Sequence, residues 1–135
     1  MRAPSGGFAQ GWAFLALTGE SDRRRFWTSV PNAVEHCPEL SPAPVIIVPL
    51  ARERSYTERC TQPEKTSENP DTGPEFTVPY WYIVAGTASL LMLLTAVDRG
   101  LDACFFTISP PEVPVFRATF AVPEDYDPIG AVTVG

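Results

Sequence analysis

The stretch that decides the fold is residues 80–99, YWYIVAGTASLLMLLTAVDR. A patch of small residues is followed by a continuous Leu and Met block, and Arg99 with Gly100 supplies the cation and the glycine typical of a helix C-terminus. A helix with no polar face is normally buried by other elements. The stretch therefore predicts a central helix that is covered on every side.

The same region raises a membrane-spanning alternative. Residues 77–97 carry no charge, and their length is close to the ~20 residues that cross a bilayer. Pro79, Gly86 and several hydroxyl residues lower the hydropathy, and Asp98 follows directly. The next run reads as a strand that would pair with the rest of the chain. A buried core or interface helix is therefore favoured over a membrane span.

Apolar runs on both sides of this helix predict the strands that it covers. Residues 44–50 are β-branched and bounded by prolines, which indicates a core strand near a sheet edge. Residues 51–75 are polar and proline-rich, which is typical of a long surface loop or lid. Strands are predicted at residues 12–17, 44–50, 101–108 and 131–134, and helices at 23–27 (capped by Ser21 and Asp22), 80–99 and 113–120. This set indicates one α+β domain over residues 1–135.

Composition and charge narrow the possible partners. Hydrophobic residues make up 44% of the chain and charged residues 19%, as in a globular protein. The net charge of −6 argues against nucleic acid or an anionic membrane as the main partner. The one basic run, Arg23 to Arg25, fits the solvated face of a short helix.

The cysteines and the histidine predict no metal site. Cys37, Cys60 and Cys104 are far apart, and His36 alone cannot complete a tetrahedral set. Free thiols in a reducing compartment are the simplest interpretation. The N-terminus lacks the pattern of a secretory leader, so a cytoplasmic protein is expected.

Catalytic motifs are also missing from the sequence. No Ser-His-Asp set, glycine-rich phosphate loop or nucleophile elbow is present. Glu124, Asp125 and Asp127 lie among prolines and are expected to be solvated turn residues. The residues alone therefore predict an α+β domain with a hydrophobic helix and no acid–base pair.

Three segments nevertheless resemble the nitroreductase family. Residues 3–14, APSGGFAQGWAF, are similar to the family segment A-P-S-x-x-N-x-Q-P-W-x-F. Residues 79–106 resemble its central helix, the G-L-D-A turn and the hydrophobic strand that follows. Residues 120–135, FAVPEDYDPIGAVTVG, resemble the family's Pro-Glu-Asp ending with a last strand. The segments come in the family's order and cover much of the chain.

The resemblance implies an FMN-dependent oxidoreductase that takes hydride from NAD(P)H and reduces a small electron acceptor such as a nitro-aromatic or a quinone. Its fold would be an antiparallel or mixed sheet packed on a long buried central helix. Flavin carries the chemistry, so no protein catalytic residue is needed. By this resemblance, one subunit would contact the flavin through Pro4, Ser5, Gly6 and Phe8, and the other through Phe105, Phe106, Thr107 and Ile108. Core packing is the alternative role for the phenylalanines, and a turn or cap role for Ser5.

The resemblance also implies a homodimer with the central helix at its interface, since an isolated chain would expose a large apolar patch. The chain departs from the family at several points. The basic helix that holds the flavin phosphate does not precede Ala3, so Arg2 is the one cation next to the turn, and the partner-embracing arm does not follow Gly135. Phe8 stands where the family has Asn. A partial domain is therefore expected, either part of an active flavoprotein or a remnant that binds a ligand or partner without catalysis.

Overall fold

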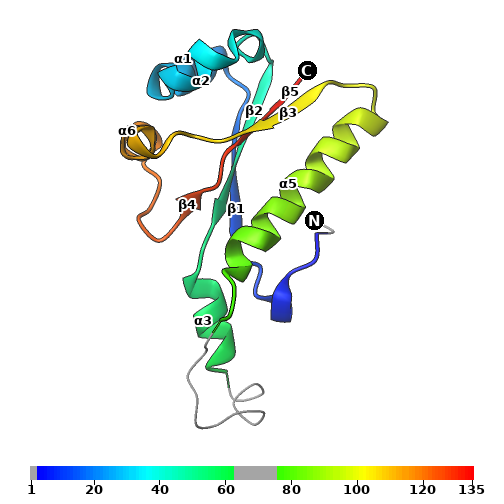
Figure 1. The fold of residues 1–135 in the computed structure, drawn as a ribbon, viewed down its shortest axis with the longest axis vertical. Helices are drawn as coiled ribbons and strands as arrows, with labels where there is room; N and C mark the ends of the chain where they lie inside the picture. Colours follow the sequence, from blue (N-terminus) through cyan, green and yellow to red (C-terminus); the bar gives the residue numbers. More distant parts are fainter. Residues whose placement is uncertain (1–2, 63–75) are drawn as a thin grey trace.

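The computed structural model describes residues 3–62 and 76–135. Its strands form one antiparallel sheet in the order β1-β2-β5-β3, and β4 pairs with β2 beside β5 (Figure 1). The strands are β1 (Trp12–Leu17), β2 (Val45–Ala51), β3 (Ala103–Phe106), β4 (Asp127–Pro128) and β5 (Ala131–Val134). The helices are α1 (Glu20–Ser29), α2 (Pro31–His36), α3 (Arg54–Cys60), α5 (Tyr80–Asp98) and α6 (Val113–Phe120), with 3-10 turns η1 (Gly6–Phe8), η2 (Pro38–Leu40) and η3 (Pro110–Glu112). The predicted α+β class is confirmed.

Strand β2 lies inside the sheet, so its predicted place near an edge is wrong. It pairs with β1 on one side and with β5 and β4 on the other. Pro49 is tolerated because β5 pairs only as far as Ile47 and β4 begins at Leu50. The Pro49 carbonyl accepts a hydrogen bond from the Ile129 N–H at 3.1 Å on this side of β2. The missing proline N–H therefore breaks no bond of the strand ladder there.

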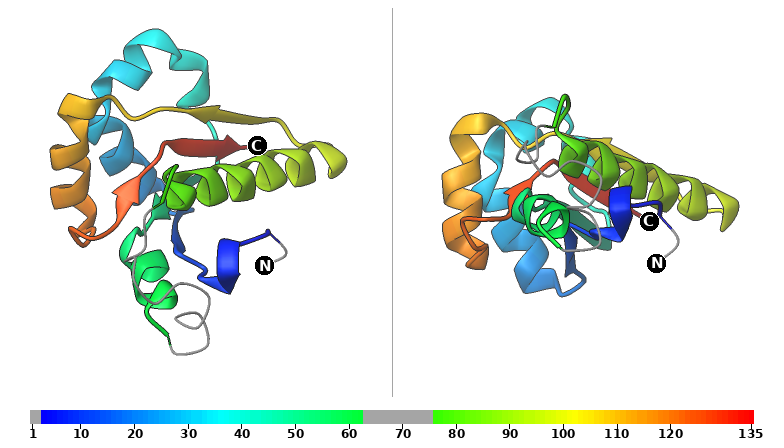
Figure 2. Two further views of the ribbon diagram at one scale, coloured as in Figure 1. Left: turned by 60° about the horizontal axis from the view of Figure 1, so that its bottom comes forward. Right: turned by 90° about the horizontal axis from the view of Figure 1, so that it is seen from below.

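Helix α5 lies across one face of the sheet, and α1 and α6 cover the other (Figures 1 and 2). Its inner side is made of small residues, including the buried Ala85, Ala88 and Ser89, which let it approach the strands closely. By length and composition α5 could cross a membrane, with a mean hydropathy of 1.6. The core helix of a soluble protein passes the same test, and here α5 packs on β2 and β3.

The outer side of α5 is exposed, so the prediction of a helix covered on every side is wrong for the single chain. Four large apolar residues lie there. Each follows the one before it by seven, four and three positions in turn, which places all four on one helical face. We refer to Ile83, Leu90, Leu94 and Val97, with exposed fractions of 51%, 53%, 57% and 65%, as the apolar stripe. The helix therefore joins the core by its small residues and presents its large ones outward.

The main core lies between the sheet and helices α1 and α6. Phe26 and Phe116 are fully buried there, with ring centroids 6.0 Å apart at 82°. Phe26 and Trp27 face inward as predicted. Helix α1 is longer than predicted and begins after Gly19, so the expected side-chain caps at Ser21 and Asp22 are wrong. Asp22 instead lies in the first turn, where its charge favours the helix dipole.

The predicted loop at residues 51–75 contains a helix, α3, at Arg54–Cys60. Tyr56 is buried to 3% exposure, and Arg54 pairs with Glu58 one turn later at 2.6 Å. Burial of this one aromatic ring and the local ion pair explain a helix that lacks apolar periodicity. Residues 63–75, the rest of the predicted loop, lie outside the described residues.

Candidate functional site

The N-terminal turn (residues 4–8) contains the first group of predicted site residues, Pro4, Ser5, Gly6 and Phe8. Ser5 is extended, and its carbonyl accepts from the Phe8 N–H at 2.9 Å. The Ser5 hydroxyl oxygen accepts from the Gln10 N–H at 2.7 Å. Ser5 therefore stabilises the turn itself, while its own hydroxyl hydrogen remains able to donate to a ligand.

Phe8 projects from this turn into solvent. Its side chain is 76% exposed, and its backbone is left-handed with φ of 57°. The alternative of core packing is therefore wrong for Phe8 in the single chain. A bulky residue in this conformation is uncommon and costs conformational energy, and an exposed phenyl ring is available for a contact with another molecule.

Helix α3 supports the turn from behind. Arg59 donates from Nε to the Gly7 carbonyl at 2.9 Å. A Cβ on Gly11 would lie 2.5 Å from the Tyr56 ring, so only glycine permits this packing. The turn is thus fixed by a helix that the sequence pattern did not predict.

The second group of predicted site residues lies on β3 and the loop after it. The Phe106 ring stacks on Trp27, with centroids 5.7 Å apart and 15° between the planes, so its side chain belongs to the core. A Cβ on Gly130 would lie 2.5 Å from both the Phe105 ring and the Phe106 carbonyl. In the single chain, the side chains of Phe105 and Phe106 therefore serve packing.

The loop after β3 has two backbone donors that bond to no other part of the described chain. The Thr107 side chain is exposed, whereas Ile108 is buried in the main core. Within residues 3–62 and 76–135, neither the Thr107 N–H nor the Ile108 N–H donates a hydrogen bond. Since Thr107 is exposed at the edge of the sheet, these donors are open to an acceptor from water or from a ligand.

The structure does not bring the two predicted groups together. The N-terminal turn leads into β1 at one edge of the sheet, whereas Phe105 lies on β3 at the other edge. The register aligns Ala16, Ile47, Val132 and Phe105 across the sheet. Three strand spacings of ~4.8 Å place β1 and β3 about 14 Å apart. One chain therefore cannot enclose a single ring with both groups.

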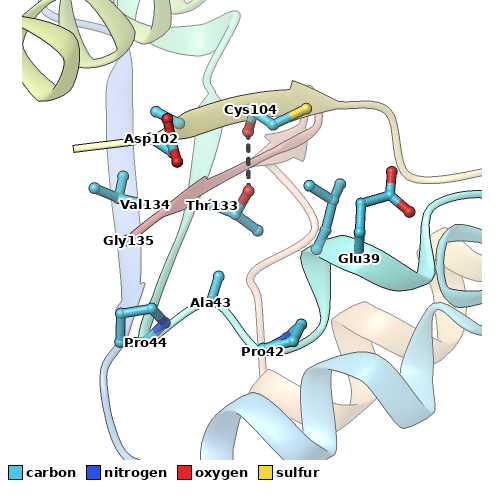
Figure 3. A pocket seen from close by; sticks show the side chains of 11 residues that line it. Glu39, Pro42, Ala43, Pro44, Asp102, Cys104, Thr133, Val134 and Gly135 are labelled. Atoms are coloured by element: carbon cyan, nitrogen blue, oxygen red, sulfur yellow. Dashed lines mark hydrogen bonds between the residues drawn. The ribbon is translucent and has the colours of Figure 1, made fainter.

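Two hollows lie elsewhere on the molecule. One of about 690 Å³ lies between α5 and the sheet, with Phe14, Ile47 and Met92 on its walls and Arg99 at its edge. The other, of about 350 Å³, lies between η2 and the β3–β5 pair (Figure 3). Glu39 and Asp102 line this second hollow, and like charges of that sign disfavour a phosphate there.

Asp125 and Asp127, which precede β5, form ion pairs, so their predicted role as merely solvated turn residues is incomplete. Arg52 donates to Asp125 at 2.7 Å, and this hydrogen bond raises the pKa of Arg52. Arg117 donates to Asp127 at 2.7 Å, and the Tyr82 hydroxyl donates to the same carboxylate at 2.9 Å. Burial, followed by this hydrogen bond, raises the pKa of Tyr82. These pairs tie α5 and α6 to β4.

The remaining polar candidates are one histidine and three cysteines. His36 hydrogen-bonds through Nδ1 to the Asn32 carbonyl at 2.8 Å, one turn earlier in α2. Cys37, Cys60 and Cys104 are free thiols. Arg2, the cation next to the turn, lies outside the described residues.

Sequence reasoning missed an aromatic group beside the N-terminal turn. Tyr56 from α3 lies near Trp81 and, with Phe76 and Tyr80 at the start of α5, forms a cluster of rings with centroids 5.9–6.5 Å apart. The cluster depends on α3, which has no apolar period. A lone Tyr within a polar segment, close to a Phe-x-x-x-Tyr-Trp run, was the available signal.

Comparisons with known sequences and with solved structures point to the same protein family. The model of the Nitroreductase family matches residues 1–135. A protein from Clostridium acetobutylicum, provisionally named an NADH oxidase, is 25% identical, with a TM-score of 0.68 over 100% of this chain and 69% of its own. A nitroreductase family protein from Clostridium novyi NT is 16% identical, with a TM-score of 0.74 over 99% of this chain and 66% of its own.

Nitroreductase A from Vibrio parahaemolyticus is 16% identical, with a TM-score of 0.69 over 98% of this chain and 52% of its own. This chain therefore spans between half and about two thirds of these relatives. No curated protein matches the sequence. Family match and fold agree: the chain belongs to the nitroreductase family.

Proposed function

We propose that the chain is part of an FMN-dependent NAD(P)H oxidoreductase that reduces nitro-aromatic, quinone or similar electron-poor acceptors. Membership of the nitroreductase family supports oxidoreductase activity. The proposed protein is a cytoplasmic homodimer whose two flavin sites each draw on both chains. Flavin, when bound, supplies the hydride and electron transfer, which accounts for a chain without an acid–base pair.

The observation that carries the proposal is the unpaired Thr107 and Ile108 N–H pair after β3. An isoalloxazine ring offers carbonyl and ring-nitrogen acceptors to such donors. In the proposed site, these amides bind the ring from one subunit while Phe105 and Phe106 fix the strand that presents them. Pro4, Ser5, Gly6 and Phe8 of the other subunit form the opposite wall, where the Ser5 hydroxyl can donate.

The apolar stripe supports the dimer. Four large apolar side chains more than half exposed on one helix are unusual for a monomer and are typical of a protein interface. A two-fold axis through α5 would bury each stripe against its own copy. In the proposed dimer, β3 of one chain faces the N-terminal turn of the other.

The test is a titration of the purified chain with FMN, followed by its fluorescence quenching. Thr107→Pro removes the amide N–H, whereas Thr107→Ala keeps the N–H and removes only the exposed side chain. One lost hydrogen bond of about 1.5 kcal/mol corresponds to about 10-fold weaker binding. We expect that loss for the proline variant alone. Equal FMN affinity in both variants, with unchanged melting temperatures, would remove this amide from the site.

A second function is a non-catalytic module that binds a partner. The exposed apolar stripe favours it. Absence of FMN binding at millimolar flavin, together with a stable dimer, would select this alternative. Flavin binding with oxidation of NADPH in the presence of a nitro-aromatic would select the enzyme.

A further inference from the structure

The larger of the two hollows described above lies between helix α5 and the sheet, and its volume is about 690 Å³. We refer to it as the α5 groove. Its floor is formed by side chains of three neighbouring strands, namely Phe14 of β1, Ile47 of β2 and Val134 of β5. One wall is the side of α5 that carries Leu91 and Met92. Sites for small molecules have volumes of about 300–1,000 Å³ and are mostly apolar, so the groove has the size and lining of such a site.

Arg99 is the only charged residue among the described residues that line the α5 groove. Its side chain is exposed, and it forms no ion pair with any described residue. Asp98 and Asp102 are close in sequence, but neither lines the groove or pairs with Arg99. The last carbonyls of α5 accept hydrogen bonds from the backbone N–H groups of Arg99, Gly100 and Leu101, so they do not need the guanidinium. The guanidinium is therefore open to an anion at the end of the groove.

The position of this cation defines one end of a bound molecule. The groove follows α5 from Ala88 to Arg99, a stretch over which the helix rises about 16 Å. The Thr95 hydroxyl also lines the groove, but it already donates to the Leu91 carbonyl at 2.7 Å. An elongated apolar groove with a cation at one end matches a linear alkyl chain that ends in an anionic group. A carboxylate is the group that a guanidinium binds through paired N–H donors.

We propose that the α5 groove binds a medium-chain fatty-acid anion, with the alkyl chain along the groove and the carboxylate on the Arg99 guanidinium. Binding removes the alkyl chain from water and places it against Phe14, Ile47 and Met92. The ion pair adds less than the chain does, because an exposed guanidinium is screened by water. The groove contains none of the residues assigned to the flavin, so this inference does not rest on the proposed function.

The test is a titration of the purified chain with octanoate, hexanoate and octan-1-ol, followed by the NMR amide signals of Ala88 and Ala96. Both alanines line the groove, and we expect octanoate to shift both signals. The two further methylenes of octanoate, about half-buried in an open groove, should make it bind about 4-fold more tightly than hexanoate. The ion pair should make it bind about 5-fold more tightly than octan-1-ol, which has as many carbons and no charge.

Two variants separate the contributions of charge and shape. Arg99→Gln should remove the preference for octanoate and leave the binding of octan-1-ol unchanged. Arg24→Gln is the matched control, because it removes the same charge from α1 on the other face of the sheet, where Arg24 pairs with Glu20. It should bind both ligands as the parent does. Thr95→Phe, at an exposed position of the wall, fills the groove and should weaken both ligands alike.

Unshifted alanine signals would overturn the proposal. Equal affinity of the parent for octanoate and octan-1-ol would also overturn it, as would octanoate binding that is as tight in Arg99→Gln or Thr95→Phe as in the parent. Alanine signals that change with the concentration of the chain but not with octanoate would assign the groove to a second copy of the chain, and that result would overturn the proposal as well.

Discussion

Leu94 lies in the middle of the apolar stripe, and its truncation tests the dimer. Leu94→Ala removes three carbons, each worth about 0.8 kcal/mol when fully buried. Since Leu94 is 57% exposed in the single chain, a partner can bury about that fraction, which gives about 1.4 kcal/mol per chain. A two-fold interface contains the residue twice. The dimer should therefore weaken by about 2.7 kcal/mol, or about 100-fold in its dissociation constant.

Sedimentation equilibrium over a concentration series measures this constant directly. The matched control is Val115→Ala, because Val115 is 53% exposed on α6, away from the stripe. It should leave the constant unchanged. The same dissociation constant for Leu94→Ala and the parent would refute the placement of the interface on α5. A parent chain that stays monomeric at millimolar concentration would refute the dimer altogether.

Four further predictions concern stability. Gly130→Ala should lower the free energy of unfolding by at least about 2 kcal/mol, because its φ is 150° and the new Cβ would strike backbone and ring. Gly86→Ala, in open space on α5, should raise it by about 1 kcal/mol. Tyr56→Phe should raise the melting temperature, since it removes an unpaired buried hydroxyl. The pKa of Tyr82 is raised from 10.0 in the folded state. The stability that comes from its contact with Asp127 is therefore present below pH 10 and lost as pH rises through the folded-state pKa. In Tyr82→Phe, the free energy of unfolding should fall less over that alkaline range.

Urea unfolding followed by circular dichroism measures the free energies of unfolding, and thermal unfolding followed by the same signal measures the melting temperature. A Gly130→Ala variant as stable as Gly86→Ala would contradict the strain at that turn. A lower melting temperature for Tyr56→Phe would show that its hydroxyl has a partner. An alkaline loss of the same size with and without the Tyr82 hydroxyl would assign that loss to other groups.

Apolar periodicity was sufficient to predict the bounds of an element whose own residues form an apolar run. The strand at Trp12–Leu17 and the helix at Val113–Phe120 have the predicted bounds, because each is an apolar run ended by glycine, proline or a turn. Helix α3 could not be predicted in this way. Its residues have no apolar face, and it is stabilised by burial of Tyr56 against a turn some fifty positions earlier in the chain.

For the candidate site, the sequence predicts two short segments but not how they are arranged in space. The family resemblance predicts the N-terminal turn and residues 105–108 as parts of the site, but a strand pattern does not specify strand order. The internal place of β2, made possible at Pro49 by the gap between β5 and β4, puts those segments at opposite edges. The aromatic group around Tyr56 was not predictable, since it depends on contacts between segments that are distant in the sequence.

The separation of the N-terminal turn and the Thr107–Ile108 amides at opposite sheet edges has a consequence for stoichiometry. Under the proposed function, every flavin is held by contributions from two chains, so dilution that dissociates the chains also releases the cofactor. Two defective chains, one altered at Ser5 and one at Thr107, would then complement each other: each mixed pair regains one intact flavin position and has one doubly defective position. Bound flavin thereby reports the composition of the assembled pairs.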